Sequence, residues 1–161
     1  MKVVLKLVLL LSVMSGSFAL ANESDQLKDF VNKYEETWQS HDAKRLADYF
    51  ADNADMIVGI QPRIVGREAI ESWWSQYFSR IDSGRVVSIS IESISNLSPN
   101  IALLNVHSTT GGTHSKTREV MESRKARGTW VVARVSGNWK IAALRMHSPV
   151  GEIRDAPGTD N

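Results

Sequence analysis

Large apolar side chains recur every three or four residues in two stretches of the chain, residues 27–38 and 70–81. A repeat near 3.6 residues is typical of an amphipathic α-helix, so both stretches are predicted to be helical. A shorter helix is expected between them over residues 42–50, with Asp42 as its N-cap. The three predicted apolar faces consist of Leu27, Phe30, Val31, Tyr34 and Trp38; of Leu46, Tyr49 and Phe50; and of Ile70, Trp73, Trp74, Tyr77, Phe78 and Ile81.

Beyond Ser83 the apolar repeat shortens to two residues, which is typical of half-buried strands. Asn100 is expected to turn the first strand into the second, and residues 136–138 to join the last two as a hairpin. Gly111-Gly112 is expected to end the second strand, whereas residues 113–128 fit a strand, a hairpin tip or a loop equally well. These strands are predicted over residues 87–92, 101–109, 129–135 and 139–147. A short strand is also expected earlier in the chain, where it joins the second and third helices.

Helices followed by a run of antiparallel strands predict an α+β domain with the helices on one face of a curved sheet. The chain has 161 residues, of which 42% are apolar, and this suits one domain with one core. We place the domain at residues 22–150. Residues 151–161 have little to bury, so a flexible C-terminal tail is expected there.

The first 21 residues have the pattern of a secretory signal peptide. Lys2 and Lys6 precede a short apolar run, and Ala19-Leu20-Ala21 fits a cleavage site before Asn22. The apolar run is shorter than the roughly 20 residues that span a bilayer, and the sequence contains no cysteine to carry a lipid. We therefore expect a periplasmic or secreted protein without a membrane partner after cleavage.

Composition and motifs argue against several other classes of partner. The chain has 19 basic and 18 acidic residues, and this balance is not the electrostatic footprint of a nucleic-acid-binding protein. No pair of histidines stands at metal-ligand spacing, and no glycine-rich phosphate loop is present. We expect neither a metal ion nor a cofactor.

Three short motifs, taken in order, are similar to those of a known family. They are Phe-Ala-Asp-Asn-Ala at residues 50–54, Gly-Arg-Glu-Ala-Ile at 66–70 and Trp-Lys-Ile-Ala-Ala at 139–143. Together with the first helix they resemble the SnoaL-like branch of the nuclear transport factor 2-like superfamily, especially its SgcJ/EcaC-type members. The resemblance implies a ketosteroid isomerase-like fold, in which three helices accompany a strongly curved, mostly antiparallel sheet that wraps the first helix into a cone. It also implies a ligand cavity at the open end and a homodimer formed through the outer sheet face.

The isomerases of this superfamily provide one comparison of site residues. Counting from the Phe-Ala-Asp motif, Tyr34 falls where their oxyanion-binding tyrosine lies, and Val58 falls at the position of their catalytic aspartate. Valine cannot accept a proton, so this chain does not resemble a working steroid isomerase. Asp52 and Asp55 are expected at the end of the second helix, where they serve loop hydrogen bonds rather than catalysis.

The dehydratases of the superfamily place histidines in the cavity, and His107 and His147 are the candidates here. Strand alternation groups His107 with Asn105, and His147 with Arg145. If these faces point inward, the four side chains form a polar patch in an apolar cavity; the alternative is that each histidine emerges into solvent at a strand end. The other expected ligand-binding residues are Trp38, Met56, Val58, Trp74 and Phe78.

Three functions remain open at this stage. The first is an exported domain that binds a small, largely apolar molecule of unassigned activity. The second is a cofactor-free lyase or isomerase, dehydratase- or cyclase-like, with Tyr34 as donor and His107 or His147 as base. The third is a non-catalytic dimerisation module, consistent with apolar residues on both faces of the strand at 129–135.

Overall fold

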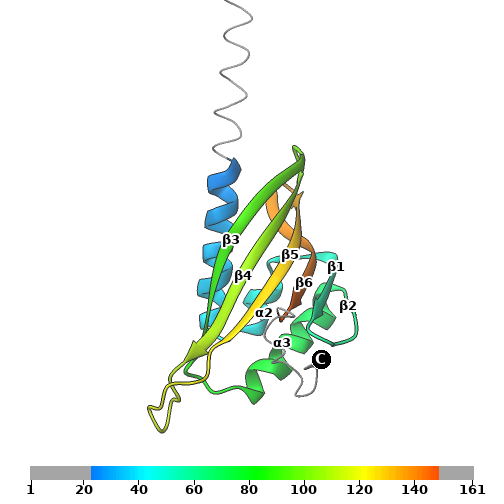
Figure 1. Ribbon diagram of the computed structural model, residues 1–161. Coiled ribbons are helices and arrows are strands. Elements are labelled where there is room, and N and C mark those ends of the chain that lie inside the picture. The colour runs from blue at the N-terminus through cyan, green and yellow to red at the C-terminus, as the bar shows by residue number, and fades with distance from the viewer. Residues whose placement is uncertain (1–22, 149–161) are drawn as a thin grey trace, which may run out of the picture.

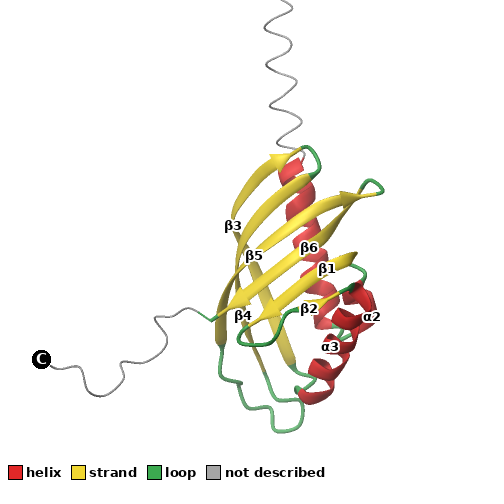
Figure 2. Cartoon of the chain, turned by 90° about the vertical axis from the view of Figure 1, so that its right-hand side faces the viewer, coloured by secondary structure: helices red, strands yellow, loops and turns green. Residues whose placement is uncertain are grey.

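Three helices accompany a curved six-stranded sheet in the computed structural model, which describes residues 23–148 (Figure 1). The N-terminal helix spans residues 23–39 and runs along the inner face of the sheet (Figure 2). The predicted signal peptide, its predicted cleavage site and the predicted tail at 151–161 lie outside the described residues. The other elements are α2 (Ala43–Ala47), β1 (Phe50–Val58), β2 (Ile64–Val65), α3 (Arg67–Arg80), β3 (Arg85–Ser98), β4 (Ile101–Gly112), β5 (Arg124–Val135) and β6 (Asn138–His147).

The strands lie in the order β2-β1-β6-β5-β4-β3. Only β1 and β6 run parallel, and each of the other neighbouring pairs is antiparallel. The predicted α+β class with a mostly antiparallel sheet is therefore confirmed. Glu35 on the N-terminal helix accepts a hydrogen bond from the Ile89 backbone N–H at 2.6 Å, and Gln39 Nε2 donates to the Val87 carbonyl at 2.6 Å. These bonds attach the edge strand β3 to the helix.

The second helix is shorter than its sequence pattern predicts. Asp42 caps it as expected, because its Oδ1 accepts a hydrogen bond from the Arg45 N–H at 3.0 Å. The helix ends at Ala47, however, and Phe50 already begins β1. The Tyr49 carbonyl accepts a bond from the Ile141 N–H at 2.7 Å, so pairing with β6 takes this segment from the helix.

The same correction moves Asp52 and Asp55 from the expected end of the second helix into β1. Asp52 remains at the surface, where it pairs with Arg67 at 2.9 Å. Asp55 is buried, and its Oδ2 accepts hydrogen bonds from Arg63 and, at 2.6 Å, from Arg145. The expectation of loop hydrogen bonds is therefore wrong for Asp55, which instead joins β1 to β6 through an ion pair.

Of residues 113–128, which could not be assigned from sequence, residues 113–123 form the loop between β4 and β5, and residues 124–128 belong to β5. Asp82 holds this loop, since the Asp82 carboxylate accepts hydrogen bonds from the backbone N–H groups of Gly84 and Ser115 at 2.8 and 2.9 Å. Strand β4 continues through Gly111 and Gly112 instead of ending there. Gly112 has φ 122°, and a side chain on it would lie 2.1 Å from the Gly84 carbonyl oxygen. Glycine thus permits close approach of β3 rather than breaking the strand.

The sheet has a buried inner face and a more exposed outer face. On β4 the even-numbered residues, from Ala102 to Ser108, are buried against the helices, whereas the odd-numbered residues lie on the outer face. On β6 the alternation is interrupted, because Val132 pairs with Ile141 while Val131 pairs with Ala143. Ala142 is the extra residue of a β-bulge, and it reverses the facing of every later residue in the strand.

Candidate functional site

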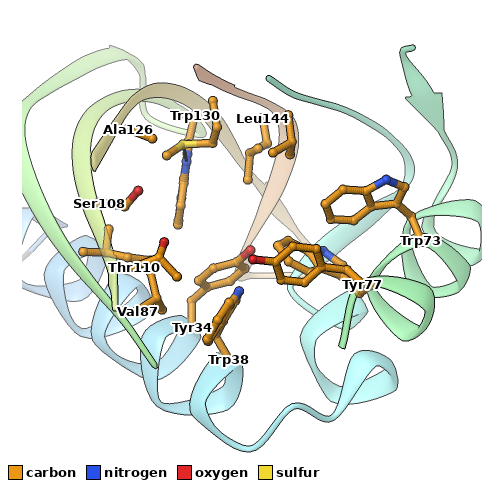
Figure 3. Close-up of a pocket in the computed structure, with 14 residues that line it drawn as sticks. Tyr34, Trp38, Trp73, Tyr77, Val87, Ser108, Thr110, Ala126, Trp130 and Leu144 are labelled. Atoms are coloured by element: carbon orange, nitrogen blue, oxygen red, sulfur yellow. Dashed lines mark hydrogen bonds between the residues drawn. The ribbon is translucent and has the colours of Figure 1, made fainter. Parts of the chain in front are cut away.

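A cavity of about 140 Å³ lies between the inner face of the sheet, the N-terminal helix and α3 (Figure 3). Apolar cavities of about 150 Å³ accommodate a benzene-sized ring, so this space suits one ring with a small substituent. Its lining consists of Tyr34, Trp38, Val58, Trp73, Trp74, Tyr77, Val87, Ile89, Ser108, Thr110, Ala126, Trp130, Leu144 and Met146.

Helical spacing explains the aromatic side of the cavity. Tyr34 and Trp38 are four residues apart on the N-terminal helix, and Trp73 and Tyr77 are four apart on α3, so each pair shares one helix face. The Trp73 and Tyr77 rings stack with centroids 5.4 Å apart. Across the cavity, the Tyr34 ring meets Trp130 of β5 edge-on at 4.9 Å. The Trp38 and Tyr77 rings, with centroids 6.3 Å apart, link the N-terminal helix to α3. Rings from three elements therefore restrict one another's orientation.

Two tyrosine hydroxyls point into the cavity in Figure 3, those of Tyr34 and Tyr77. Burial, with a smaller contribution from Tyr49, raises the pKa of Tyr34 far above its ordinary value. Burial also raises the pKa of Tyr77, against the opposing charges of Arg85 and Arg124. Both phenols are therefore neutral near pH 7 and can donate hydrogen bonds to a ligand oxygen.

Two of the three buried indoles that line the cavity, those of Trp130 and Trp74, differ in how their N–H groups are satisfied. Trp130 Nε1 donates to Met146 Sδ at 3.4 Å. Met146 occupies space above Gly128, where a Cβ atom would lie 2.0 Å from the sulfur. Trp74 Nε1 is buried and has no partner among the described residues. An unsatisfied buried donor costs about 1–3 kcal/mol, and an acceptor on a bound ligand would remove that cost.

The structure brings four of the sequence-predicted site residues to the cavity and leaves two beside it. Tyr34, Trp38, Val58 and Trp74 line the space. Met56 and Phe78 are buried in the surrounding core and do not line it.

The other four predicted residues lie on the opposite side of the sheet, and the expected polar patch is wrong in its placement. On β4, Asn105 and His107 share the outer face, because the even-numbered residues are the buried ones. On β6 the bulge turns Arg145 and His147 outward and brings Leu144 and Met146 inward. Strand alternation identifies residues that share a face, but it does not tell which face covers the core.

On this outer face, His107 and Asn105 each contact polar side chains of neighbouring strands. His107 Nε2 lies 2.8 Å from Glu92 Oε2. The Asn105 amide bridges two neighbouring strands, since it donates to Ser93 Oγ at 3.0 Å and accepts from Thr129 Oγ1 at 3.0 Å. A lyase or isomerase that uses Tyr34 with His107 or His147 is therefore not supported by this geometry.

Several lining residues were missed by the sequence reasoning. Trp73 and Tyr77 were already on the predicted apolar face of α3, so helical spacing was a usable signal. Ser108 and Thr110 carried no signal of their own, because they become lining residues only once the inner face of β4 is known. Within residues 23–148, no group of three or more metal-ligating side chains lies close enough to hold an ion.

Comparison with known proteins identifies the family. A model of the SnoaL-like domain matches residues 27–148. The chain belongs to the SnoaL-like domain family. This membership confirms the resemblance inferred from the three motifs, and the match spans every strand of the sheet. A search of curated proteins finds no match to this SnoaL-like domain.

Solved structures with the same fold agree with this assignment. A proposed scytalone dehydratase from Novosphingobium aromaticivorans superposes with a TM-score of 0.73 at 16% identity, covering 83% of this chain and 89% of its own. A nuclear transport factor 2-like protein with a cystatin-like fold from the same species gives 0.70 at 16%, covering 86% and 89%. A ketosteroid isomerase-like protein from Erwinia carotovora gives 0.62 at 13%, covering 75% and 92%. At these identities the likeness establishes the fold and not the activity.

Proposed function

We propose that this SnoaL-like domain binds a small, largely apolar molecule in the cavity between its helices and its sheet. The main support for this proposal is a ring-sized space lined by tyrosines and tryptophans, with few polar groups facing it. Small-molecule sites have this composition, in which apolar walls supply affinity and a few polar groups set orientation. Tyr34, Tyr77 and the unpartnered Trp74 N–H are among the donors available for that purpose.

Binding is favoured over chemistry because the lining carries no side chain suited to proton transfer near pH 7. Among the described lining residues, the titratable ones are Tyr34 and Tyr77, and the pKa of each is raised. Val58 lies in the cavity at the position that the isomerase resemblance gives to a catalytic aspartate. A general base needs a pKa near the working pH, and neither phenol meets that need.

We also propose that the domain is exported and pairs with a second copy. The amino-terminal pattern of charge, apolar run and Ala-x-Ala site supports export. The intact mass of periplasmic protein tests export, with Asn22 expected as the first residue.

The proposed pairing with a second copy is supported by an outer sheet face that no described helix covers (Figure 2). On this face Leu103, Val131 and Ala143 lie side by side across three strands. Sedimentation velocity at two protein concentrations tests this homodimer.

Filling the cavity provides the test of ligand binding. Ala126 lines the space from β5, and Ala126→Leu would occupy room that a ring needs. With 4-ethylphenol as the probe in isothermal calorimetry, we expect the variant to bind at least about tenfold more weakly than the unmodified protein, a difference of about 1.4 kcal/mol. The matched control is Ala69→Leu, at an exposed position of α3. Equal affinities in the three proteins, or no binding by the unmodified one, would contradict the proposal.

A further inference from the structure

A second hollow adjoins the aromatic cavity and carries several positive charges. It shares Tyr77 and Thr110 with the cavity, so the two spaces meet at these side chains. Three arginines contribute to it, together with one acidic residue. Its lining consists of Tyr77, Arg80, Ile81, Asp82, Arg85, Thr110, His114 and Arg124.

Strand register places two of the arginines at the edge of the cavity. Thr110 of β4 pairs with Val87 on one side and with Arg124 on the other, and both Thr110 and Val87 line the cavity. Arg85 stands two residues before Val87, so it lies on the same inner face of β3. On the inner face of the sheet, Arg85 and Arg124 therefore lie next to the residues that line the cavity.

The charges of these arginines reach the groups inside the cavity. Tyr77 lines both spaces, and burial raises its pKa while the charges of Arg85 and Arg124 act in the opposite direction. The Tyr77 hydroxyl therefore lies within electrostatic range of both guanidinium groups. An oxygen of a ligand at this point would meet the phenol and both cations together.

Neither Arg85 nor Arg124 has an acidic partner within residues 23–148. The one carboxylate in the hollow belongs to Asp82, and it is occupied with the loop after β4. Hydrogen bonds from the backbone of Gly84 and Ser115 lower the pKa of Asp82 to about 2. Arg80 contributes a third cation, which contacts the neutral Gln76 side chain at 3.4 Å. The hollow is therefore positive overall.

We propose that the ligand is a small aromatic carboxylic acid, whose ring fills the cavity while its carboxylate reaches Arg85 and Arg124. This assignment rests on the binding function proposed above and adds the chemical class of the ligand. A ring-sized apolar space opening on unpaired arginines matches a molecule with one apolar end and one anionic end. Guanidinium groups hold carboxylates through charge-assisted hydrogen bonds. Thr110 lines both spaces and pairs with Arg124, and its hydroxyl can accept or donate another hydrogen bond.

The test compares an acid with its neutral amide. 3-Phenylpropanoate and 3-phenylpropanamide have the same ring and chain, so calorimetry at low salt separates the contribution of the charge. We expect the acid to bind at least about tenfold more tightly than the amide, and this preference to fall as ionic strength rises. Arg85→Gln and Arg124→Gln should each reduce the preference without weakening the amide.

Arg127→Gln is the matched control. Arg127 belongs to β5 like Arg124, but it pairs with His107 on the outer face, so its loss should leave the preference for the acid unchanged. Equal affinity for acid and amide would overturn the inference while leaving ligand binding in place. An unchanged preference in both Arg85→Gln and Arg124→Gln would overturn it as well. If neither probe binds, the proposed binding function fails together with the inference.

Discussion

Replacing Trp38 with alanine is expected to lower the free energy of unfolding by about 3–5 kcal/mol. Only 4% of Trp38 is exposed, and its ring packs edge-on against His41 at 5.3 Å and Phe78 at 5.4 Å. Truncation would enlarge the cavity and remove contacts that join the N-terminal helix to α3. Urea unfolding followed by circular dichroism would measure the loss.

Trp73→Ala provides the comparison for this prediction. Trp73 also lines the cavity, but it is less buried and packs on Trp74 and Tyr77 of its own helix. A smaller loss of stability is expected, because its removal breaks fewer contacts between elements. Equal losses for the two variants would show that Trp38 does not couple the helices in the way the structure indicates.

Asp55→Asn is expected to cost about 1–3 kcal/mol at pH 7. The Asp55 carboxylate is 7% exposed and faces two arginines, of which Arg145 is 40% and Arg63 is 61% exposed. The solvent around both guanidinium groups weakens the ion pairs, so the expected loss is smaller than for a fully buried pair. Asp52 lies on the same strand as Asp55 and forms an exposed ion pair with Arg67 of α3. Asp52→Asn is therefore the matched control, and it should cost close to nothing.

The effect of Asp55→Asn should also depend on pH. Burial alone would raise the pKa of Asp55, but hydrogen bonds and charges from Arg145 and Arg63 outweigh burial and lower it. The charged form is therefore favoured in the folded state. Its stabilisation is present above the ordinary carboxyl pKa of about 4 and is lost as the pH falls through the lowered folded value. Unfolding at pH 7 and pH 3 should show a smaller deficit at pH 3, and equal deficits would mean that charge is not the cause.

Local patterns in the sequence determined much of the helical side of the molecule. The apolar repeats of the N-terminal helix and α3 predicted which faces are buried, and with them the lining residues Tyr34, Trp38 and Trp74. These predictions succeeded because the period of a helix relates neighbours four residues apart, whatever the rest of the chain does. The order of helices and strands likewise sufficed for the α+β class, and the three motifs sufficed for the family.

Only the tertiary structure decided how the sheet presents its side chains. Alternation grouped Asn105 with His107 correctly, yet the helices cover the other face of β4. The bulge at Ala142 turned Arg145 and His147 outward, and no local pattern marked it. Parallel pairing with β6 likewise converted the expected end of the second helix into β1 and buried Asp55. Contacts between distant segments decide which sheet face a side chain occupies, the strand register and the strand pairing. The same contacts place Arg85 and Arg124 beside the aromatic cavity.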